Sequence, residues 1–285
     1  MEFKQVRPGV HLLVAEPESV NVGLVVGPER AWLIDCGSSP AQGESIRAAA
    51  AAVSDRPLAG VALTHGHWDH SFGLAAFADL ETIGQQDCQS AQRGDEAQRA
   101  ARSLGLELDR LPGPSQTIGL IAVRDLGAGQ VMELAHFGPA HTRGDLVVAL
   151  PGADVIFVGD LIETAGPPQF DSESSVDGWV KSLDSLWAIL KPNTLVAPGH
   201  GPVAEPWQVG HQRAGLAAIW GQTEWAYHQG LAPEQIYHHD QLEWPWDRAT
   251  AERGIALAYA ELRARGPRRA PLPLIQTRRR SDPAL

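Results

Sequence analysis

Hydrophobic and polar positions along the first 200 residues form short strand-like runs interleaved with helical stretches. The apolar runs predict strands over Val10–Val14, Val20–Val26, Ala31–Ile34, Leu58–Thr64, Gln116–Val123, Gln130–Ala135, Leu146–Leu150 and Val155–Val158. Stretches with helical spacing or helix-forming composition predict helices over Ala41–Val53, Ser71–Leu80, Gln85–Leu104 and Val176–Leu190. Strand groups with helices between them indicate a layered protein that mixes helices and sheets.

The pattern changes after Pro206, where helical stretches follow one another without strands. Val209–Gln229 and Asp247–Arg265 are predicted helices, and a Trp-Pro-Trp segment, residues 244–246, lies between them. One interpretation is that these helices cover a cleft in the first part of the chain and shape a substrate pocket. The other is that the aromatic rings pack the helices onto that part or form a homodimer contact, and we favour packing.

One hexapeptide stands out from this pattern, because residues 65–70 read His-Gly-His-Trp-Asp-His directly after an apolar strand. A single histidine there is usually a hydrogen-bonded structural residue. Three imidazoles and a carboxylate together are costly to charge in a half-buried turn without a cation, and they are ligands for Zn²⁺ or Fe²⁺. His65 and His67 point the same way in an extended segment, so both can reach one ion. Asp69 and His70 are neighbours and diverge, which suits a second ion.

Three later turns present the same residue types at strand boundaries. His141 lies in a Gly-Pro turn before a predicted strand, Asp160 follows another strand through a glycine, and His200 follows an apolar Leu-Val-Ala run. The glycine near each of them permits a close approach of the backbone. Each residue alone reads equally well as a turn residue, but as a set they supply further ligands for two four-coordinate ions.

These positions together resemble the signature of the metallo-β-lactamase superfamily, an HxHxDH loop followed by a lone His, an Asp and a last His. The resemblance covers about residues 8–204 and implies a four-layer αββα sandwich, here with a C-terminal helical extension. The metal ligands that it implies are His65, His67 and His141 for one ion and Asp69, His70 and His200 for the other, with Asp160 bridging both. The turn Leu33–Gly37 matches the family's early Asp-x-Gly, whose Asp35 would support a ligand and not bind the metal itself.

The bridging residue separates the branches of this superfamily. The resemblance implies that chains with Asp at position 160 are more similar to the glyoxalase II, lactonase and nuclease branches than to true β-lactamases. The best-known lactamases place Cys there or lack the bridge. Cys36 lies in the early turn and Cys88 in a polar stretch beyond the metal loop, so neither can fill that role. A β-lactam hydrolase is therefore the less favoured alternative.

Length and composition fit one enzyme-sized domain with an appendage. The 285 residues are 44% hydrophobic, which allows a sizeable core that does not depend on metal. We expect a catalytic domain over residues 1–204, a helical extension over residues 205–265 and a disordered Arg/Pro-rich tail over residues 266–285. No apolar stretch reaches the length of a membrane span, and the start of the chain lacks a secretory pattern. Because the two cysteines show no pairing pattern either, we expect a cytoplasmic protein that does not bind membranes.

The formal charge of −11 is unevenly distributed. The tail carries five arginines against one aspartate, which leaves −15 for the rest of the chain. An acidic body is a poor electrostatic partner for nucleic acid, which weakens the nuclease branch although the basic tail keeps it open. We therefore expect no nucleic-acid partner.

The expected chemistry follows from a pair of ions. Two divalent ions about 3.5–4 Å apart can share a bridging hydroxide near neutral pH, which attacks a carbonyl group. Asp69 and Asp160 are the expected catalytic residues, and with the hydroxide they leave a net charge of about +1 on the site. That charge suits a small-molecule substrate with an anionic group. We expect a dinuclear hydrolase of an ester, thioester or lactone, with two Zn²⁺ per chain, although iron or manganese accepts the same ligand types.

Other interpretations stay open at this point. A mononuclear Fe(II) enzyme similar to persulfide dioxygenases shares the same loop, and a degenerate binding module would have lost the chemistry. Three residues are weaker candidates for substrate contacts. Arg143 follows a ligand and could hold an anion or form a surface ion pair, while Trp68 and Phe170 could line a pocket or fill the core.

Overall fold

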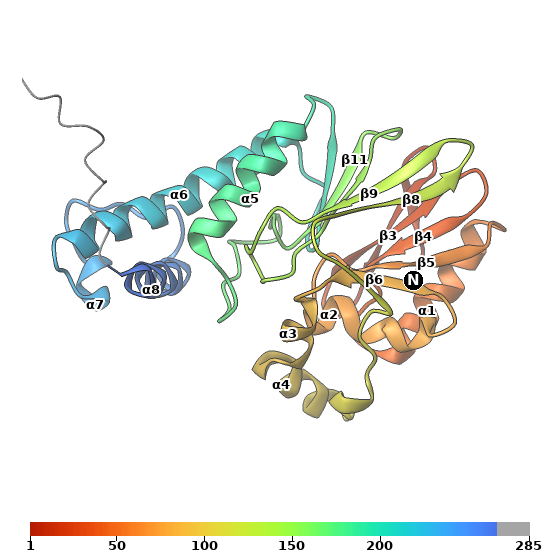
Figure 1. Ribbon diagram of the computed structural model, residues 1–285, viewed down its shortest axis with the longest axis horizontal. Helices are drawn as coiled ribbons and strands as arrows, with labels where there is room; N and C mark the ends of the chain where they lie inside the picture. The colour runs from red at the N-terminus through yellow and green to blue at the C-terminus, as the bar shows by residue number, and fades with distance from the viewer. Residues whose placement is uncertain (267–285) are drawn as a thin grey trace, which may run out of the picture.

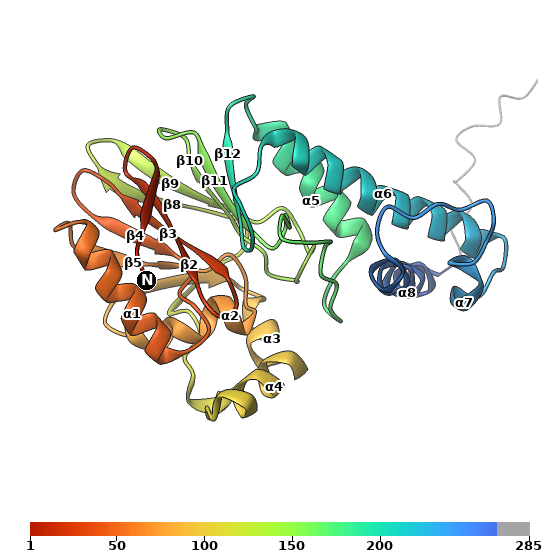
Figure 2. The same cartoon turned by 180° about the vertical axis from the view of Figure 1, so that it is seen from behind.

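A computed structural model describes residues 1–266 of the chain, which form two β-sheets with helices on their outer faces (Figure 1, Figure 2). The first sheet has seven strands in sequential order: β1 (Lys4–Arg7), β2 (Val10–Ala15), β3 (Val20–Val26), β4 (Ala31–Ile34), β5 (Leu58–Ala62), β6 (Glu81–Gln85) and β7 (Gln116–Ile118). Strands β1 to β4 pair antiparallel, and β4 to β7 pair parallel. The parallel strands therefore end at the same edge of the sheet.

The second sheet has five strands in the order β12-β11-β10-β9-β8. Their bounds are β8 (Ile121–Gly127), β9 (Gln130–Ala135), β10 (Val147–Leu150), β11 (Val155–Gly159) and β12 (Leu195–Pro198). All neighbours are antiparallel except β11 and β12, which run parallel. The carboxyl ends of β11 and β12 therefore lie side by side.

Helices complete the layers on both sides. The α-helices are α1 (Pro40–Val53), α2 (Trp68–Ser71), α3 (Cys88–Arg93), α4 (Asp95–Leu104), α5 (Val176–Ile189), α6 (Pro206–His228), α7 (Pro233–Ile236) and α8 (Arg248–Arg265), and the 3-10 helices are η1 (Phe72–Phe77) and η2 (Leu108–Arg110). Helix α1 lies on the outer face of the first sheet, and α5 lies on the outer face of the second (Figure 2).

Three apolar clusters hold these layers together. The inner faces of the sheets share one cluster, in which Trp32 of the first sheet and Phe157 of the second are buried. Gly23 of β3 leaves the room for that ring, since a Cβ there would lie 2.3 Å from Phe157 Cε1. Ile46 of α1 and Leu183 of α5 belong to the two outer clusters. The order helix, sheet, sheet, helix confirms the αββα sandwich expected from the sequence.

Local capping sets where the main helices begin. Ser39 and Ser175 accept a backbone N–H at the starts of α1 and α5, and Asp247 does the same for α8. Such side chains satisfy amide groups that have no partner within the helix. Pro40 follows Ser39 at a position where its fixed φ suits a first helical turn.

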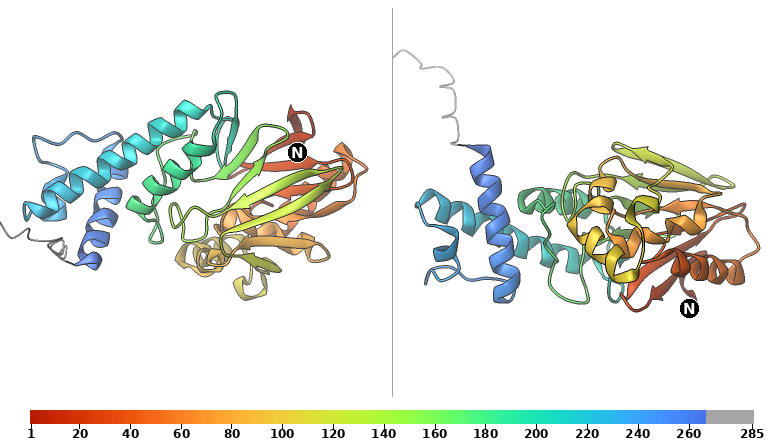
Figure 3. Two further views of the ribbon diagram at one scale, coloured as in Figure 1. Left: turned by 45° about the horizontal axis from the view of Figure 1, so that its top comes forward. Right: turned by 90° about the horizontal axis from the view of Figure 1, so that it is seen from below.

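Helices α6, α7 and α8 form the part of the described chain beyond residue 205 (Figure 3). Helix α6 packs against α5 and α8, and the ring of Trp246 packs directly on Gly215 of α6. Trp244 and Trp220 are partly buried in the same cluster, whereas Trp207 is 61% exposed. Within residues 1–266, none of the helices combines the length and the hydrophobicity that a membrane crossing requires. The tail for which the sequence predicts disorder lies outside the described residues from 267 onwards.

Three sequence predictions of secondary structure need correction, and some short elements were not predicted. The predicted helix Ser71–Leu80 is the short helix α2 followed by the 3-10 helix η1, and Gln85–Leu104 contains two helices that are broken at Gly94. The predicted strand Gln116–Val123 is divided between β7 and β8, which belong to different sheets. Strands β1 and β6 and helix α7 are additional elements, each of six or fewer residues and too short for a periodic pattern.

Candidate metal centre

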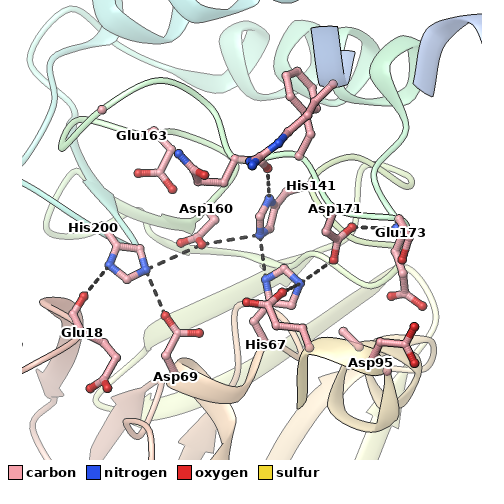
Figure 4. A pocket seen from close by; sticks show the side chains of 18 of the residues that line it. Glu18, His67, Asp69, Asp95, His141, Asp160, Glu163, Asp171, Glu173 and His200 are labelled. Carbon is pink, nitrogen blue, oxygen red and sulfur yellow. Dashed lines mark hydrogen bonds and ion pairs between the residues drawn. The ribbon is translucent and has the colours of Figure 1, made fainter. Parts of the chain in front are cut away.

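The seven residues of the signature meet at one edge of the sandwich, in the loops that follow strands of both sheets. Figure 4 labels five of them, which are His67, Asp69, His141, Asp160 and His200. Four of them, within residues 65–70, follow β5 of the first sheet, and the last two of these lie in α2. The other three follow strands β9, β11 and β12 of the second sheet and are His141, Asp160 and His200. The site therefore depends on the two sheets being packed together.

A first cluster consists of His65, His67 and His141, each with one ring nitrogen directed at a common point. Nε2 of His65 lies 3.1 Å from Nδ1 of His67, and Nε2 of His141 lies 2.9 Å from the same Nδ1. The three rings stand nearly perpendicular to one another, with interplanar angles of 82°, 81° and 89°. All three side chains are buried. This is the convergent arrangement that one ion with three imidazole ligands requires.

A second cluster consists of Asp69, His70 and His200. The Nε2 atoms of the two histidines are 3.3 Å apart, and Oδ2 of Asp69 lies 3.2 Å from Nε2 of His200. The same carboxylate oxygen lies 3.7 Å from Nε2 of His70. The three ligand atoms lie within 4.8 Å of one another, so they can contact one ion.

Asp160 lies between the two clusters. Its Oδ2 atom lies 3.5 Å from Nε2 of His141 in the first cluster and 3.7 Å from Nε2 of His200 in the second. Its Oδ1 atom is buried and has no hydrogen-bond partner, although Nε2 of His70 is 3.4 Å away. An unsatisfied buried carboxylate oxygen costs free energy, and a cation at this position would remove that cost.

In each imidazole, the ring nitrogen that faces away from the cluster (the outer nitrogen) forms a hydrogen bond with an oxygen atom. These oxygens are Thr64 Oγ1 for His65 (3.1 Å), Asp171 Oδ2 for His67 (2.8 Å), Asp35 Oδ2 for His70 (2.9 Å), the carbonyl of Gln169 for His141 (3.1 Å) and the carbonyl of Glu18 for His200 (3.1 Å). An outer nitrogen that donates to oxygen leaves the inner nitrogen with a bare lone pair. When all five imidazoles are in the neutral form that binds metal, their five inner lone pairs face one another across 2.9 to 3.3 Å, and cations between them would turn this repulsion into attraction. The donor set fits two metal ions.

Asp35 lies where the sequence analysis expects a residue that supports a ligand. One of its carboxylate oxygens accepts hydrogen bonds from the hydroxyl of Thr64 (2.7 Å) and from Nδ1 of His70, and the other accepts from the backbone N–H of Thr64 (2.7 Å). Because the Thr64 hydroxyl donates to Asp35, its oxygen is left to accept from His65. Asp35 thus orients one imidazole of each cluster, directly for His70 and through Thr64 for His65.

The charges of the site also call for cations. Burial alone would raise the pKa of Asp160, but His70 and His65 hold this pKa well below its ordinary value. Burial alone would likewise lower the pKa of His70, but Asp160, Asp69 and Asp35 raise it well above the ordinary value. Three carboxylates around one imidazole leave an excess of negative charge, which divalent ions would balance.

Two histidines of the first cluster are neutral at pH 7. Burial, reinforced by nearby imidazoles, lowers the pKa of His65 well below its ordinary value and lowers the pKa of His141 to about 4. A metal ion needs the neutral form of imidazole as its ligand. Two members of the cluster are therefore already in the state that metal binding requires.

The family model described as the metallo-β-lactamase superfamily matches residues 15–200, a segment that contains all seven ligand candidates. This chain belongs to the metallo-β-lactamase superfamily. The resemblance inferred from the hexapeptide and the three later turns is thereby confirmed. Membership supports the class of metal-dependent hydrolases that the sequence predicts.

Two similar proteins of this superfamily match only parts of the chain. A metallo-β-lactamase type 2 from Bacillus sp. (strain 170) is 28% identical over 149 residues, which are 51% of this chain and 52% of that protein. A hydroxyacylglutathione hydrolase from Fuscovulum blasticum is 32% identical over 111 residues, which are 39% of this chain and 40% of that protein. The chain therefore spans about half of the length of the first relative and less of the second.

Solved structures of other members share the fold over most of their length. A metallo-β-lactamase from Erythrobacter litoralis, crystallised with β-mercaptoethanol in its active site, superposes with a TM-score of 0.60 at 23% identity, covering 75% of this chain and 95% of that chain. A metallo-β-lactamase from Pontibacter korlensis gives a TM-score of 0.60 at 21% identity, covering 76% of this chain and 98% of that chain. At these identities the likeness establishes the fold.

In this member of the superfamily the two clusters open into a cleft with a volume of about 800 Å³ (Figure 4). The walls beyond the clusters carry six carboxylates, which are Glu18, Asp95, Glu96, Glu163, Asp171 and Glu173. Two guanidinium groups lie among them, Arg99 from α4 and Arg253 from α8. A cleft of this size accommodates a small molecule.

The three candidate substrate residues lie in different surroundings. Phe170 is buried and lines the cleft. Trp68 lies outside the lining, where it packs with Phe72 at a centroid distance of 6.3 Å. Arg143 is exposed and also lies outside the lining, although it directly follows His141. The geometry thus brings one of the three to the cleft.

Asp171 and Glu163 also line the cleft, although no sequence pattern marks either of them. Burial alone would lower the pKa of His67, but the hydrogen bond and the charge of Asp171 raise this pKa to about 9. Burial first, and then the charges of Asp160 and Asp69, raise the pKa of Glu163 to about 9. Both carboxylates lie in the irregular segment between β11 and α5, where no periodicity distinguishes one polar residue from another.

Proposed function

We propose that this protein is a dinuclear metal-dependent hydrolase that cleaves an ester, a thioester or a lactone. The observation that carries the proposal is the position of Asp160, whose Oδ2 lies 3.5 to 3.7 Å from ligand nitrogens of both clusters. A carboxylate placed in this way can bridge two ions and set their separation. The three His of one cluster and the Asp, His and His of the other then complete the two ligand sets.

We propose zinc as the metal of both sites. Five imidazoles with two carboxylates are nitrogen and oxygen donors of the kind that Zn²⁺ takes in catalytic sites. Iron and manganese accept the same donors, so the metal that is bound has to be identified by elemental analysis.

A pair of divalent ions bound at these positions would supply two kinds of chemistry. They would activate a water nucleophile near neutral pH, and they would polarise the carbonyl of the substrate. The protein's own part is to orient and to hold protons. Asp69 lines the cleft, and its carboxylate can accept a hydrogen bond from the attacking water and direct a lone pair at the carbonyl carbon. Asp35 and Asp171 keep the outer nitrogens of His70 and His67 protonated, which keeps the inner nitrogens free to act as ligands.

The relatives support the hydrolase class more than any one substrate. One is named as a hydroxyacylglutathione hydrolase and another as a metallo-β-lactamase, and each match covers about half of the chain or less. We favour an ester, thioester or lactone over a lactam because the bridging position holds Asp160. Neither cysteine can take its place, since Cys36 and Cys88 are buried outside the ligand clusters of the described chain.

Metal analysis together with a substrate panel tests this proposal. We expect elemental analysis of the purified protein to find two zinc ions per chain, and we expect turnover of at least one ester, thioester or lactone. A single iron per chain with oxygen uptake at an electrode would instead indicate the mononuclear dioxygenase chemistry. Hydrolysis confined to a β-lactam would contradict the substrate class, and a protein that takes up no metal would contradict the whole proposal.

We further propose that the substrate is a small molecule with an anionic group, held at the mouth of the cleft. Arg99 and Arg253 line the cleft, and neither guanidinium forms an ion pair with a carboxylate among residues 1–266. An unpaired guanidinium is a ready donor to a carboxylate or a phosphate. The partner is then the substrate itself, and we propose no contact with nucleic acid or membrane.

Replacing Arg253 with Gln is expected to raise KM about 10-fold for an anionic substrate, since a hydrogen bond to a charged group contributes about 1.5 kcal/mol or more. The kcat should change little, because Arg253 lies on α8 and not among the metal ligands. A neutral analogue with the same scissile bond should show no change in KM. Steady-state kinetics on the two substrates measures the difference, with Arg213→Gln, which removes an ion pair to Asp184 on the outer helices, as the control. Equal effects on both substrates would rule out a role for Arg253 in charge recognition.

A further inference from the structure

We propose that the segment Gln169–Ser174 is a positioning element for the first ion, and that helix α8 holds this segment in place from outside. The inference rests on the proposed metal centre and goes beyond it, because it assigns the helical extension a role in metal affinity. The role is specific to one of the two sites. It is carried by contacts on both sides of the segment.

On its inner side the segment fixes two of the three imidazoles of the first cluster. The carbonyl of Gln169 accepts a hydrogen bond from Nδ1 of His141 (3.1 Å), and Oδ2 of Asp171 accepts one from Nε2 of His67 (2.8 Å). The hydroxyl of Ser174 donates to the backbone carbonyl of His141 (2.7 Å). The first two bonds set the tautomers and the ring orientations of two ligands, and the third holds the backbone of His141, so together they determine how well the inner nitrogens converge.

The carboxylate of Asp171 is itself held firmly. Its Oδ1 atom accepts backbone hydrogen bonds from Glu173 (2.6 Å) and Ser174 (3.0 Å), which leaves Oδ2 for His67. The backbone N–H of Asp171 in turn donates to the hydroxyl of Ser174 (3.0 Å). The acceptor that faces His67 is therefore part of a closed turn, and its position follows the position of that turn.

On its outer side the segment is packed against the extension through Phe170. This residue lies between the two acceptors, is 8% exposed and belongs to the cluster that joins α5, α6 and α8. Its ring meets Trp179 of α5 at a centroid distance of 5.6 Å. On α8, a Cβ at Gly254 would lie 3.0 Å from Cγ2 of Ile219 on α6 and 3.2 and 3.3 Å from two atoms of the Phe170 ring. The absence of a side chain at Gly254 thus allows α8 to close directly over Phe170.

Helix α8 also forms hydrogen bonds with the start of α5, the helix that follows the segment. The carboxylate of Glu261 accepts hydrogen bonds from the backbone N–H of Val176 (2.6 Å) and from the hydroxyl of Ser175 (3.1 Å) at the start of α5. Arg265 pairs with Asp177 one turn further along α8. The segment is therefore anchored by α8 at Phe170 and again just beyond its end.

The second cluster has supports of a different origin. Nδ1 of His70 donates to Asp35, and Nδ1 of His200 donates to the carbonyl of Glu18. Both supports belong to loops of the first sheet and not to the extension. A disturbance of the contact between α8 and Phe170 should consequently weaken the first site and leave the second site unchanged.

Chelator competition on two single-site backgrounds tests this inference with zinc alone, without any measurement of turnover. In a His200→Ala background the ion that remains belongs to the first cluster, and in a His141→Ala background it belongs to the second. We add Asp171→Ala, which removes the acceptor, or Gly254→Val, which adds a side chain against both Ile219 of α6 and Phe170. We expect each to weaken zinc binding about 10- to 100-fold in the first background and less than about 3-fold in the second.

Controls separate this effect from general damage to the fold. Asp171→Asn keeps an acceptor oxygen and should recover a large part of the affinity. Gly221→Ala on α6, where an added Cβ meets nothing within 4 Å, should leave both sites unchanged. Equal weakening of both sites, or an effect of Asp171→Ala without one of Gly254→Val, would overturn the role of the extension. If the parent protein binds fewer than two ions, the proposed function fails instead, so the two failures can be told apart.

Discussion

Replacing Asp160 with Ala is expected to remove at least one of the two metal ions and to lower kcat/KM by more than about 100-fold. Residues that only support a metal ligand contribute about 10- to 100-fold, and Asp160 contacts the ligand atoms of both clusters directly. Without its carboxylate the two sites would lose their shared ligand and the charge that balances them. Elemental analysis and steady-state kinetics on the same preparation measure both effects.

Asp109→Asn is the matched control for this variant. The side chain of Asp109 lies exposed in the 3-10 helix η2 and forms no hydrogen bond or ion pair within residues 1–266. The variant therefore removes one negative charge, as Asp160→Ala does, without breaking a contact. We expect it to bind two ions and to keep full activity. Two tightly bound ions and normal turnover in Asp160→Ala would show that this carboxylate does not bridge the metals.

Replacing Gly199 with Ala is expected to disable the site by a single methyl group. A Cβ at this position would lie 1.9 Å from Oδ1 of Asp160 and 2.9 Å from Cε1 of His70, so at least one of these ligands has to move. A displacement of about 1 Å at a reacting centre can cost about 100-fold in rate. We expect a loss of that order in kcat/KM together with weaker retention of zinc on dialysis.

Gly152→Ala separates this effect from a general intolerance of glycine substitutions. Gly152 lies in the turn after β10, where an added Cβ meets nothing within 4 Å, and its φ is not in the left-handed region. We expect unchanged metal content and activity there, with a melting temperature close to that of the parent protein. If Gly199→Ala behaves in the same way, the fit around Asp160 is looser than the distances imply.

The candidate metal ligands could be identified from the sequence because local features mark them. His65 to His70 are six consecutive residues after a strand, and each later candidate has a glycine within three residues near a strand end. The residues that hydrogen-bond the outer nitrogens of these histidines have no comparable pattern in the sequence. Asp171 and the carbonyl of Gln169 act only because packing brings an irregular segment against His67 and His141, and 104 residues separate Asp171 from His67.

The layered fold could be predicted through the family resemblance, whereas several element boundaries could not. The run Gln116–Val123 reads as one strand, yet its two halves join different sheets, which only long-range pairing decides. The stretch Ser71–Leu80 has helical composition, but the chain has to turn tightly behind the ligands, and it does so as a 3-10 helix. The position of Arg143 next to His141 predicts a substrate contact, but neighbouring residues in a loop need not face the same side, and Arg143 lies outside the cleft lining.

The contribution of both sheets to the ligand set has a consequence for stability. Four ligands come from the loop after β5, and three come from loops of the other sheet. A bound metal pair would cross-link the two halves of the sandwich, so its binding free energy would add to the free energy of unfolding. The amount of zinc that a cell provides would then set how long the protein survives as well as how fast it works.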